Sequence, residues 1–480
     1  MPGLGSNRLT RKLTLGSLAL VPMATAIAFA PVVKADTPVS LPDHLETSNV
    51  KYIGNLPTPG DGVGAKVIGN YLYLTSTTGL WIYDVSTPTS PQLVSGINAN
   101  IAWENEEVPT NGKILGISNS TVCNNDTSGG SCLDLYDVTD KAHPKYLASV
   151  DGAGNHTNAC IWDCTFFWGS TGAVTDARDP LHPRLIGKWN DAANHLPGKS
   201  PHHVREIVPG IILTATQPVM LLSVRPEDGG DILHPVLLAT GTNADGRFIH
   251  SNRWPNNGAD MFALIGGETN FRPQCGTLGG AVSDNGAFMT WGTGDVSKNG
   301  KFVKGSAFHM IDEYRVNNGA FVDGAPPANV LGCSVHWFEE HPSFHNGGLV
   351  ALAAYESGTR FVQVTADGHI KEQGYFLPVG RGSTSAPHWA PDGKTVYLID
   401  YERGFDIVQW TGPTYVPQAA AAPGGAVAGA GALPVSAGGG TLPTTSSEAP
   451  VVAWRSAAWL MLLAILGVIA GGLRFGRRAR

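Results

Sequence analysis

The segment LWIYDVSTPTSPQLV, Leu80–Val94, decides the fold of this sequence. Two later segments repeat its pattern, LDLYDVTDKAHPKYL at Leu133–Leu147 and AVTDARDPLHPRLI at Ala173–Ile186. In each copy an aspartate precedes a proline by seven residues, and the pairs are Asp84 and Pro91, Asp137 and Pro144, and Asp176 and Pro183. This spacing predicts a strand that ends in an Asp-initiated turn, followed by a proline that opens an outer strand, where a missing amide donor is tolerated.

Weaker copies of the unit continue downstream. They begin at Leu221, where Ser223 takes the aspartate position, at His250, at Gly358 and at Gly404. We count seven units, and repeats of about 40 to 50 residues are typical of propeller blades. VKYIGNL, Val50–Leu56, resembles the outer strands but precedes the first unit, so we expect it to complete the last one and close the ring.

Composition supports this prediction of an all-β, seven-bladed β-propeller. The 60 glycines, 33 prolines and 15% charged residues in 480 favour a turn-rich β fold. A formal net charge of −7 provides no basic surface for nucleic acid, which we exclude as a partner.

The repeated segments resemble the LVIVD repeats of bacterial and archaeal surface proteins, a family understood to form β-propellers. The resemblance covers about Val50 to Trp410, and the Asp-to-Pro motif is clearest in the first three copies. The resemblance supports the fold far more than the activity. Because rigid propeller strands hold variable loops, we expect a surface module that binds or scaffolds an extracellular protein or a small-molecule ligand. Nothing in the chain names that partner.

The N-terminus has the pattern of a signal peptide. Three basic residues among the first twelve precede the apolar stretch Leu13–Ala30, and VKA at Val33–Ala35 provides a cleavage site before Asp36. We therefore predict a signal peptide over residues 1–35, with a retained membrane anchor as the alternative. Either interpretation exports the body, residues 36–415.

The C-terminus has the pattern of a stalk and an anchor. Residues 416–450 are mostly Ala, Gly, Pro, Ser and Thr, which predicts a flexible stalk. Residues 451–473 predict a transmembrane helix, and the arginine-rich tail 474–480 belongs on the cytoplasmic side. We expect a single-pass cell-membrane protein with an extracellular body; a buried core helix is the alternative.

The stalk also contains a motif that would allow attachment to the cell wall. LPTTS at Leu442–Ser446, followed by an apolar span and arginines, resembles the cell-wall sorting signals that sortases cleave. Those signals carry glycine where this chain has Ser446. Wall attachment is therefore the alternative to simple membrane anchoring.

Six cysteines in an exported body favour disulfides. Cys123 and Cys132 flank a turn-rich tip and predict a hairpin clamp, and Cys160 and Cys164 are close enough to pair locally. Cys275 and Cys333 remain as partners by elimination. A zinc cluster is the alternative, although no C-x-x-C pair is present.

Histidines occur in register with the repeat. His156 lies twenty residues before Asp176, and His203 lies twenty before Ser223. The other unit openings carry His250, His336 and His388, with Glu106 or Glu107 at the corresponding place in the second unit. Because the opening of each propeller unit is its innermost strand, we expect a ring of imidazoles and a carboxylate around the central channel.

Converging imidazoles are good ligands for copper, zinc, nickel or iron. We therefore predict a metal or anionic-ligand site in the channel, formed by His156, His203, His250, His336 and His388. The alternative is that each histidine packs against its neighbouring strand and hydrogen-bonds to backbone carbonyls. In HWFEEHPSFH, His336–His345, Pro342 breaks any helix and excludes a zinc-protease motif; we expect a polar loop at the channel mouth.

A metal in the channel raises a second hypothesis about activity, that of an exported His-ligated enzyme such as an oxidoreductase. Propellers of the selenium-binding and methanethiol oxidase type also carry channel histidines. This likeness is one of architecture, and fold alone does not transmit chemistry. The sequence therefore supports a binding or scaffolding module first and a metal-dependent enzyme second.

Overall fold

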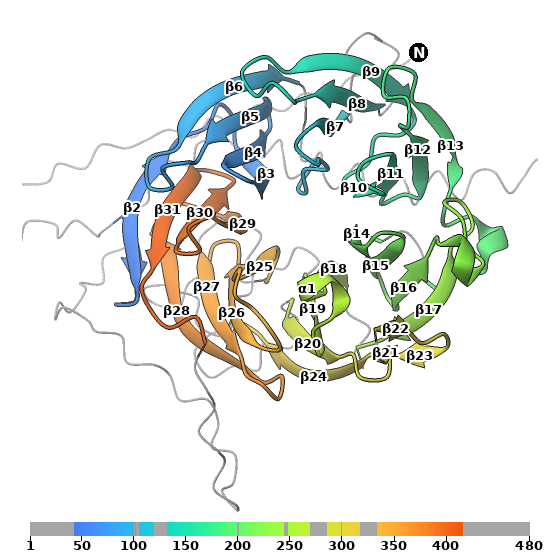
Figure 1. Cartoon of the computed structure of the whole chain (residues 1–480). Coiled ribbons are helices and arrows are strands. Elements are labelled where there is room, and N and C mark those ends of the chain that lie inside the picture. The colour runs from blue at the N-terminus through green and yellow to red at the C-terminus, as the bar shows by residue number, and fades with distance from the viewer. Residues whose placement is uncertain are drawn as a thin grey trace, which may run out of the picture.

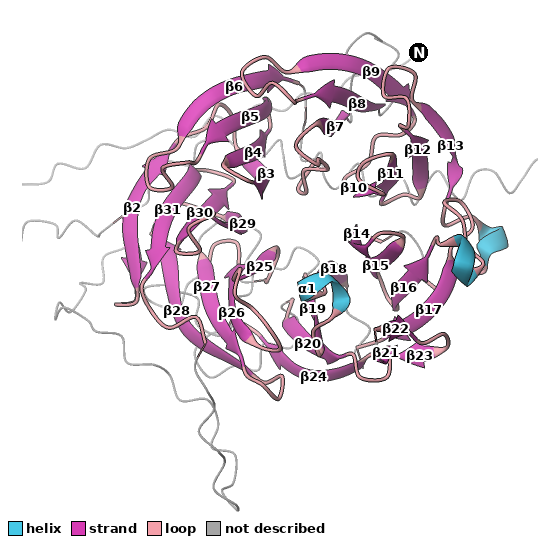
Figure 2. Ribbon diagram, viewed as in Figure 1, coloured by secondary structure: helices cyan, strands magenta, loops and turns pink. Residues whose placement is uncertain are grey.

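The computed structural model describes residues 43–99, 101, 105–119, 132–198, 201–243, 248–268, 286–298, 300–316, 334–379 and 381–415. These residues are almost entirely strands and connecting loops (Figure 2). Helical turns within them are brief: α1 (Pro255–Gly258), η1 (Ala192–Asn194) and η2 (Pro226–Asp228). The predicted all-β class is confirmed.

The described strands form seven blades around one axis (Figure 1), numbered here along the chain. Blade 1 contains β3 (Gly62–Ile68), β4 (Tyr71–Ser76), β5 (Gly79–Asp84) and β6 (Gln92–Asn98). Blade 2 contains β7 (Ile114–Asn119), β8 (Cys132–Asp137) and β9 (Lys145–Asp151). Blade 3 contains β10 (Asn158–Ile161), β11 (Phe166–Gly169), β12 (Ala173–Asp176) and β13 (Arg184–Lys188).

The remaining four blades follow the same antiparallel order from the axis outward. Blade 4 contains β14 (His203–Val208), β15 (Ile211–Ala215), β16 (Val219–Ser223) and β17 (Val236–Gly241), and blade 5 contains β18 (Ile249–Arg253), β19 (Phe262–Gly267), β20 (Phe288–Gly292) and β24 (His309–Tyr314). Blade 6 contains β25 (Phe338–Glu340), β26 (Gly348–Ala353), β27 (Thr359–Val364) and β28 (Ile370–Pro378), and blade 7 contains β29 (Thr384–Trp389), β30 (Thr395–Asp400) and β31 (Gly404–Trp410).

Short additional strands lie at the outer edge of the propeller. β1 (His44–Glu46) pairs with β28, and β23 (Ser306–Ala307) runs parallel to β17. β21 (Ser297–Lys298) and β22 (Lys301–Phe302) form a separate two-stranded ribbon.

The predicted Asp-initiated turn is confirmed in the first three units. Oδ1 of Asp84 accepts the Ser86 N–H at 2.8 Å, and Oδ1 of Asp137 accepts the Thr139 N–H at 2.8 Å. Asp176 makes the same contact, and each following proline directly precedes an outer strand, β6, β9 or β13. The motif therefore terminates the third strand and starts the fourth, as its spacing indicates.

The N-terminal segment closes the ring, as predicted. β2 (Val50–Leu56) pairs antiparallel with β31, so it supplies the outer strand of blade 7. In Figure 1 the blue β2 lies beside the orange β31, at the junction of the two ends of the propeller body. This pairing joins residues far apart in sequence and leaves no free edge between the first and last blades.

The hydrophobic core lies between blades. Leu72 and Leu74 of blade 1 pack in one cluster with Tyr397 and Ile399 of blade 7. The other six interfaces around the ring each bury a comparable cluster. Since each blade buries both of its faces against neighbours, the strands are apolar on both sides and the disc forms one body.

The cysteine predictions are partly within the described residues. Cys160 and Cys164 form the predicted local disulfide. Cys132 is also disulfide-bonded, but its predicted partner Cys123 lies outside the described residues. The predicted pair Cys275 and Cys333 lies outside them too.

The predicted terminal segments also lie outside the described residues. These are the signal peptide 1–35, the stalk 416–450, the transmembrane helix 451–473 and the tail 474–480. In the part of the chain that the structure describes, no helix is both long and apolar enough to span a bilayer.

Candidate metal centre on the propeller axis

Five side chains from consecutive blades meet near the axis, and we call them the axial cluster: Glu106, His156, His202, His250 and His336. Glu106 precedes β7, His156 precedes β10, His202 directly precedes β14, His250 lies within β18, and His336 precedes β25. Each residue therefore opens the innermost part of its blade. The repeat itself brings them together, because successive blades rotate equivalent positions around one axis.

The carboxylate of Glu106 is the centre of the cluster. Its Oε2 lies 3.3 Å from His250 Nε2, 3.4 Å from His336 Nε2 and 3.7 Å from His202 Nε2. Its Oε1 lies 3.3 Å from His156 Nε2. The carboxylate therefore has a histidine from each of four neighbouring blades around it.

The four imidazoles form a continuous row. Ring centroids are 4.7 Å apart for His156 and His202, 3.8 Å for His202 and His250, and 4.2 Å for His250 and His336. His250 and His336 are fully buried, whereas the His156 side chain is 35% exposed. The row thus runs from a solvent-accessible end into the interior.

Two aromatic residues complete the surroundings of Glu106. Trp337 Nε1–H donates to Glu106 Oε2 at 3.0 Å, and the Tyr401 hydroxyl donates to Oε1 at 3.5 Å. Both donors stabilise the ionised carboxylate. Tyr401 comes from blade 7, so the cluster is held from six blades.

The pKa values within the cluster follow from burial and mutual charge. Burial raises the pKa of Glu106, but His156 and His336 outweigh this effect and hold it well below its ordinary value. Burial and the neighbouring imidazoles lower the pKa of His202 and His250. Burial opposes protonation of His336 as well, yet Glu106 raises its pKa. The cluster therefore combines an ionised carboxylate with two imidazoles, His202 and His250, that favour the neutral form, and these are the forms that coordinate metals.

The structure brings together three of the five predicted histidines. His156, His250 and His336 surround Glu106. Of the two acidic residues predicted as alternatives, Glu106 therefore lies in the cluster. His203 pairs instead with Glu107. His388 lies 3.4 Å from Glu339. The role of these residues as metal ligands stays a prediction.

Sequence reasoning missed His202, the neighbour of His203. The pairing register of β14 with β15 shifts between Glu206 and Val208, which adds one residue to β14 relative to β10. When the paired residues of β14 and β15 are matched one by one with those of β10 and β11, His202 and not His203 corresponds to His156. A β-bulge of this kind leaves no reliable signature in one sequence, although the His202–His203 doublet marks the place.

His388 occupies a different level of its blade. It is the fifth residue of β29, whereas His156 and His336 each precede their inner strands by two residues. Its ring therefore lies farther along the axis, where Nδ1 is 3.4 Å from Glu339. In the sequence, His388 could be placed only by its approximate distance ahead of the unit at Gly404. That distance does not show whether a residue precedes its inner strand or lies within it.

A second polar network lies beside the axial cluster. Glu107 pairs with His203 and lies 2.9 Å from Arg205 Nη2. Burial lowers the pKa of His203 to about 4 despite Glu107, so this imidazole is neutral at pH 7. Glu339 lies 3.2 Å from Arg253, and it also accepts the Trp389 N–H at 2.9 Å.

Comparison with protein families agrees with the repeat. Residues 59–99 match the family model of the LVIVD repeat. This segment is an LVIVD repeat. The match coincides with blade 1, whose Asp84-to-Pro91 turn is described above. The LVIVD repeat and the seven described blades together confirm the expected resemblance and fold.

The other comparisons add no function to the LVIVD repeat. No curated protein is significantly similar to the chain. Among solved structures, a chain in "Crystal Structure of Mitotic Checkpoint Complex" is similar over 82% of this chain and 99% of its own length, at 13% identity and a TM-score of 0.43. That level of similarity carries no argument about activity or partners.

Proposed function

We propose that this protein is an exported, membrane-tethered propeller whose axial cluster binds a transition-metal ion. The propeller fold and its LVIVD repeat suggest a binding or scaffold module. The metal is the finer part of the proposal. Its principal support is the convergence of four imidazoles on the buried carboxylate of Glu106.

The spacing of the donor atoms fits a shared ion. Nitrogen and oxygen ligands bind zinc at about 2.1 Å, so two ligands of a tetrahedral ion are about 3.4 Å apart. The separations of 3.3 and 3.4 Å from Glu106 Oε2 to His250 and His336 lie close to that value, whereas His202 can share an ion with Glu106 and His156 or with His250 and Glu268. Glu106, His250 and His336 also have ligand atoms within 4.8 Å of one another.

Nitrogens without aligned hydrogen bonds provide further support. Among the described residues, His250 Nδ1 has no hydrogen-bond partner, and Nε2 of His250 and Nε2 of His336 face Glu106 at 3.3 and 3.4 Å without forming an aligned hydrogen bond. An unsatisfied buried polar group costs about 1–3 kcal/mol. A metal ion would use these lone pairs, and the orientation of His336 is fixed by its Nδ1, which lies 2.8 Å from the Ser385 carbonyl oxygen.

The donor set favours particular ions. Imidazoles with the carboxylate of Glu106, and with that of Glu268 at 3.9 Å from His250 Nε2, suit copper, zinc, iron or nickel better than calcium or magnesium, which prefer oxygen ligands throughout. Such an ion would supply Lewis-acid or redox chemistry when bound. The chain's own residues hold the donors in place: Trp337 and Tyr401 orient Glu106 through the hydrogen bonds described above.

The location of the protein rests on its terminal segments. The signal-peptide pattern of residues 1–35 and the apolar, arginine-flanked run of residues 451–473 support an extracellular body tethered to the cell membrane. The stalk of residues 416–450 would separate the propeller from the bilayer. The partner is an extracellular protein or small molecule that meets the propeller there.

Metal analysis tests the proposal. We expect the full chain, purified in detergent without a polyhistidine tag and offered copper, zinc, iron or nickel, to retain about one ion per chain after dialysis. His250→Ala should reduce the bound metal to background. His203→Ala is the matched control, since this neutral, buried imidazole pairs with Glu107, and it should retain the metal. Retention of less than about a tenth of an ion by the wild-type chain would reject the metal site.

One observation favours an enzyme as the second candidate. A cavity of about 100 Å³ has Glu106 in its wall, so a small molecule there would lie beside the axial cluster. A His-ligated oxidoreductase would need such access. Redox activity that survives both His250→Ala and His336→Ala would reject this assignment.

A further inference from the structure

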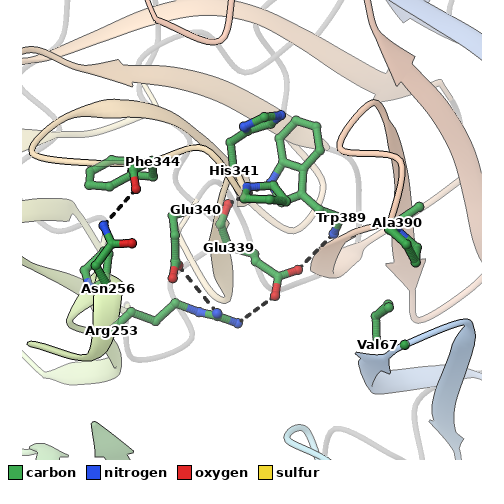
Figure 3. Close-up of a pocket in the computed structure, with 13 residues that line it drawn as sticks. Val67, Arg253, Asn256, Glu339, Glu340, His341, Phe344, Trp389 and Ala390 are labelled. Carbon is green, nitrogen blue, oxygen red and sulfur yellow. Dashed lines mark hydrogen bonds and ion pairs between the residues drawn. The ribbon is translucent and has the colours of Figure 1, made fainter. Parts of the chain in front are cut away.

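Two cavities lie in series along the axis, on the side of the propeller where the innermost strands end. The outer pocket, of about 420 Å³, is drawn in Figure 3. The inner cavity, of about 100 Å³, adjoins the axial cluster through Glu106. Val67, Arg253 and Glu339 line both cavities, so these residues lie between the two spaces.

Arg253 is held between two carboxylates at this boundary. Its guanidinium lies 3.2 Å from Glu339 and 3.4 Å from Glu340, as the dashed lines of Figure 3 show. Its Nε–H, however, has no acceptor among the described residues. A buried donor without an acceptor marks a place where a ligand oxygen would be stabilised.

Lys66 adds a second unused set of donors to the inner cavity. Its Nζ donates to the Thr110 carbonyl oxygen at 3.0 Å, and within the described part of the chain it forms no ion pair with a carboxylate. An ammonium group carries three N–H donors. Glu107 attracts this ammonium without contacting it, so the remaining N–H donors of Lys66 face the cavity and suit a ligand oxygen.

The other charges around the inner cavity are already paired. Glu107 is paired with Arg205, and Glu339 is paired with Arg253. Glu106 is directed to the imidazoles of the axial cluster, where the proposed metal would neutralise it; the inference rests on the proposed function in this respect. Among the described residues, Lys66 then has no carboxylate in contact with it, although Glu340 adds a second negative charge beside Arg253.

His388 adds an unsatisfied polar atom to the inner cavity. It is 8% exposed, lines the inner cavity, and has a buried Nε2 without a hydrogen-bond partner in the described residues. Its Nδ1 lies 3.4 Å from Glu339, and an imidazole whose Nδ1–H faces a carboxylate has a lone pair on Nε2. This nitrogen suits a water or the O–H of a ligand and does not itself attract an anion.

Size limits the ligand. The inner cavity, of about 100 Å³, is much smaller than the outer pocket of about 420 Å³, so it suits a ligand of only a few non-hydrogen atoms.

We infer that the inner cavity binds a small monovalent anion, a short carboxylate or an oxyanion of similar size, through Lys66 and Arg253 beside the axial cluster. The anion forms charge-assisted hydrogen bonds with the Lys66 ammonium and the Arg253 Nε–H. Glu340 weakens this binding, because it competes for Arg253. The site supplies the proposed metal with a neighbouring ligand or substrate of this class.

Calorimetric titration with sodium formate tests the inference. The full chain, in detergent and in gluconate buffer, is titrated both metal-loaded and after chelator treatment, with metal content measured on the same samples. We expect Lys66→Met to weaken formate binding by about tenfold or more, and Glu340→Gln to strengthen it by about two- to fivefold. Lys51→Met, at an exposed position of β2, is the matched control and should change nothing.

Opposite effects of the two cavity variants cannot arise from misfolding alone. Equal affinity in the wild type and Lys66→Met, or no formate binding to either sample, would overturn the inference. Binding that survives in Lys66→Met but disappears in His250→Ala would place the anion on the metal and would also overturn it. Absence of metal with intact, Lys66-dependent formate binding would reject the proposed metal and leave the anion site standing.

Discussion

Asp400 supplies a pH-dependent test of the packing around the axis. It is the last residue of β30 and is 1% exposed. Its Oδ1 accepts the N–H groups of Glu402 at 2.9 Å and Arg403 at 3.1 Å. This turn positions Tyr401, whose hydroxyl faces Glu106.

The sign of the effect follows from burial. Burial raises the pKa of Asp400 from 3.8 to about 6, against the opposing backbone N–H groups. The folded protein therefore holds this proton more tightly than the unfolded chain. Its contribution to stability is fully present below pH 3.8 and is lost as the pH rises through about 6, a change of about 3 kcal/mol.

Asp400→Asn mimics the protonated carboxyl at every pH and keeps an oxygen for the turn. We expect it to match the wild type near pH 4 and to exceed its unfolding free energy by up to about 3 kcal/mol at pH 7. Chemical denaturation of the metal-free chain between pH 4 and 7 measures the difference. Asp84→Asn is the control, because backbone N–H donation from Ser86 lowers the pKa of Asp84. A difference between wild type and Asp400→Asn that is constant over this range, or that favours the wild type at pH 7, would refute the reasoning.

Two further substitutions test the surroundings of Glu106. A Cβ at Gly64 would lie 1.9 Å from the Glu106 carbonyl oxygen. Gly64→Ala should therefore displace the segment that carries Glu106 and lower both the metal content and the melting temperature. Gly54→Ala is the control and should change neither, because a Cβ there would have no atom within 4 Å. Trp337→Phe removes the 3.0 Å donor to the Glu106 carboxylate and should cost about 1.5–3 kcal/mol in chemical denaturation, whereas an unchanged midpoint would show that this hydrogen bond is not needed.

Much of the fold could be predicted from local patterns. The Asp-to-Pro spacing works because one side chain terminates a strand by accepting a nearby N–H, as Asp84 and Asp137 do. Ring closure was also predictable, because Val50–Leu56 has the character of an outer strand without a unit of its own. Both signals involve residues close in sequence or repeated along it.

The composition of the axial cluster was less predictable. His156, His250 and His336 follow the repeat, but the choice between His202 and His203 depends on one extra residue within β14. A shift of one residue turns a strand side chain to the opposite face. Single-residue insertions of this kind are decided by pairing with the neighbouring strand, and the sequence of β14 alone does not reveal them.

The ion pairs around the two cavities were beyond sequence reasoning. Arg253 meets Glu339 across blades 5 and 6, and Lys66 of blade 1 shares a cavity with Arg205 of blade 4. No periodicity links such residues. Their proximity arises only after the ring has closed and placed the inner strands around the axis.

The central claim is a metal ion held on the axis of the propeller. Crystals of the metal-loaded chain, measured on either side of the absorption edge of the bound element, test it most directly. We predict one anomalous peak within bonding distance of Glu106, His250 and His336. An empty axial cluster at full metal loading, or a peak at His388 and Glu339 instead, would contradict the account.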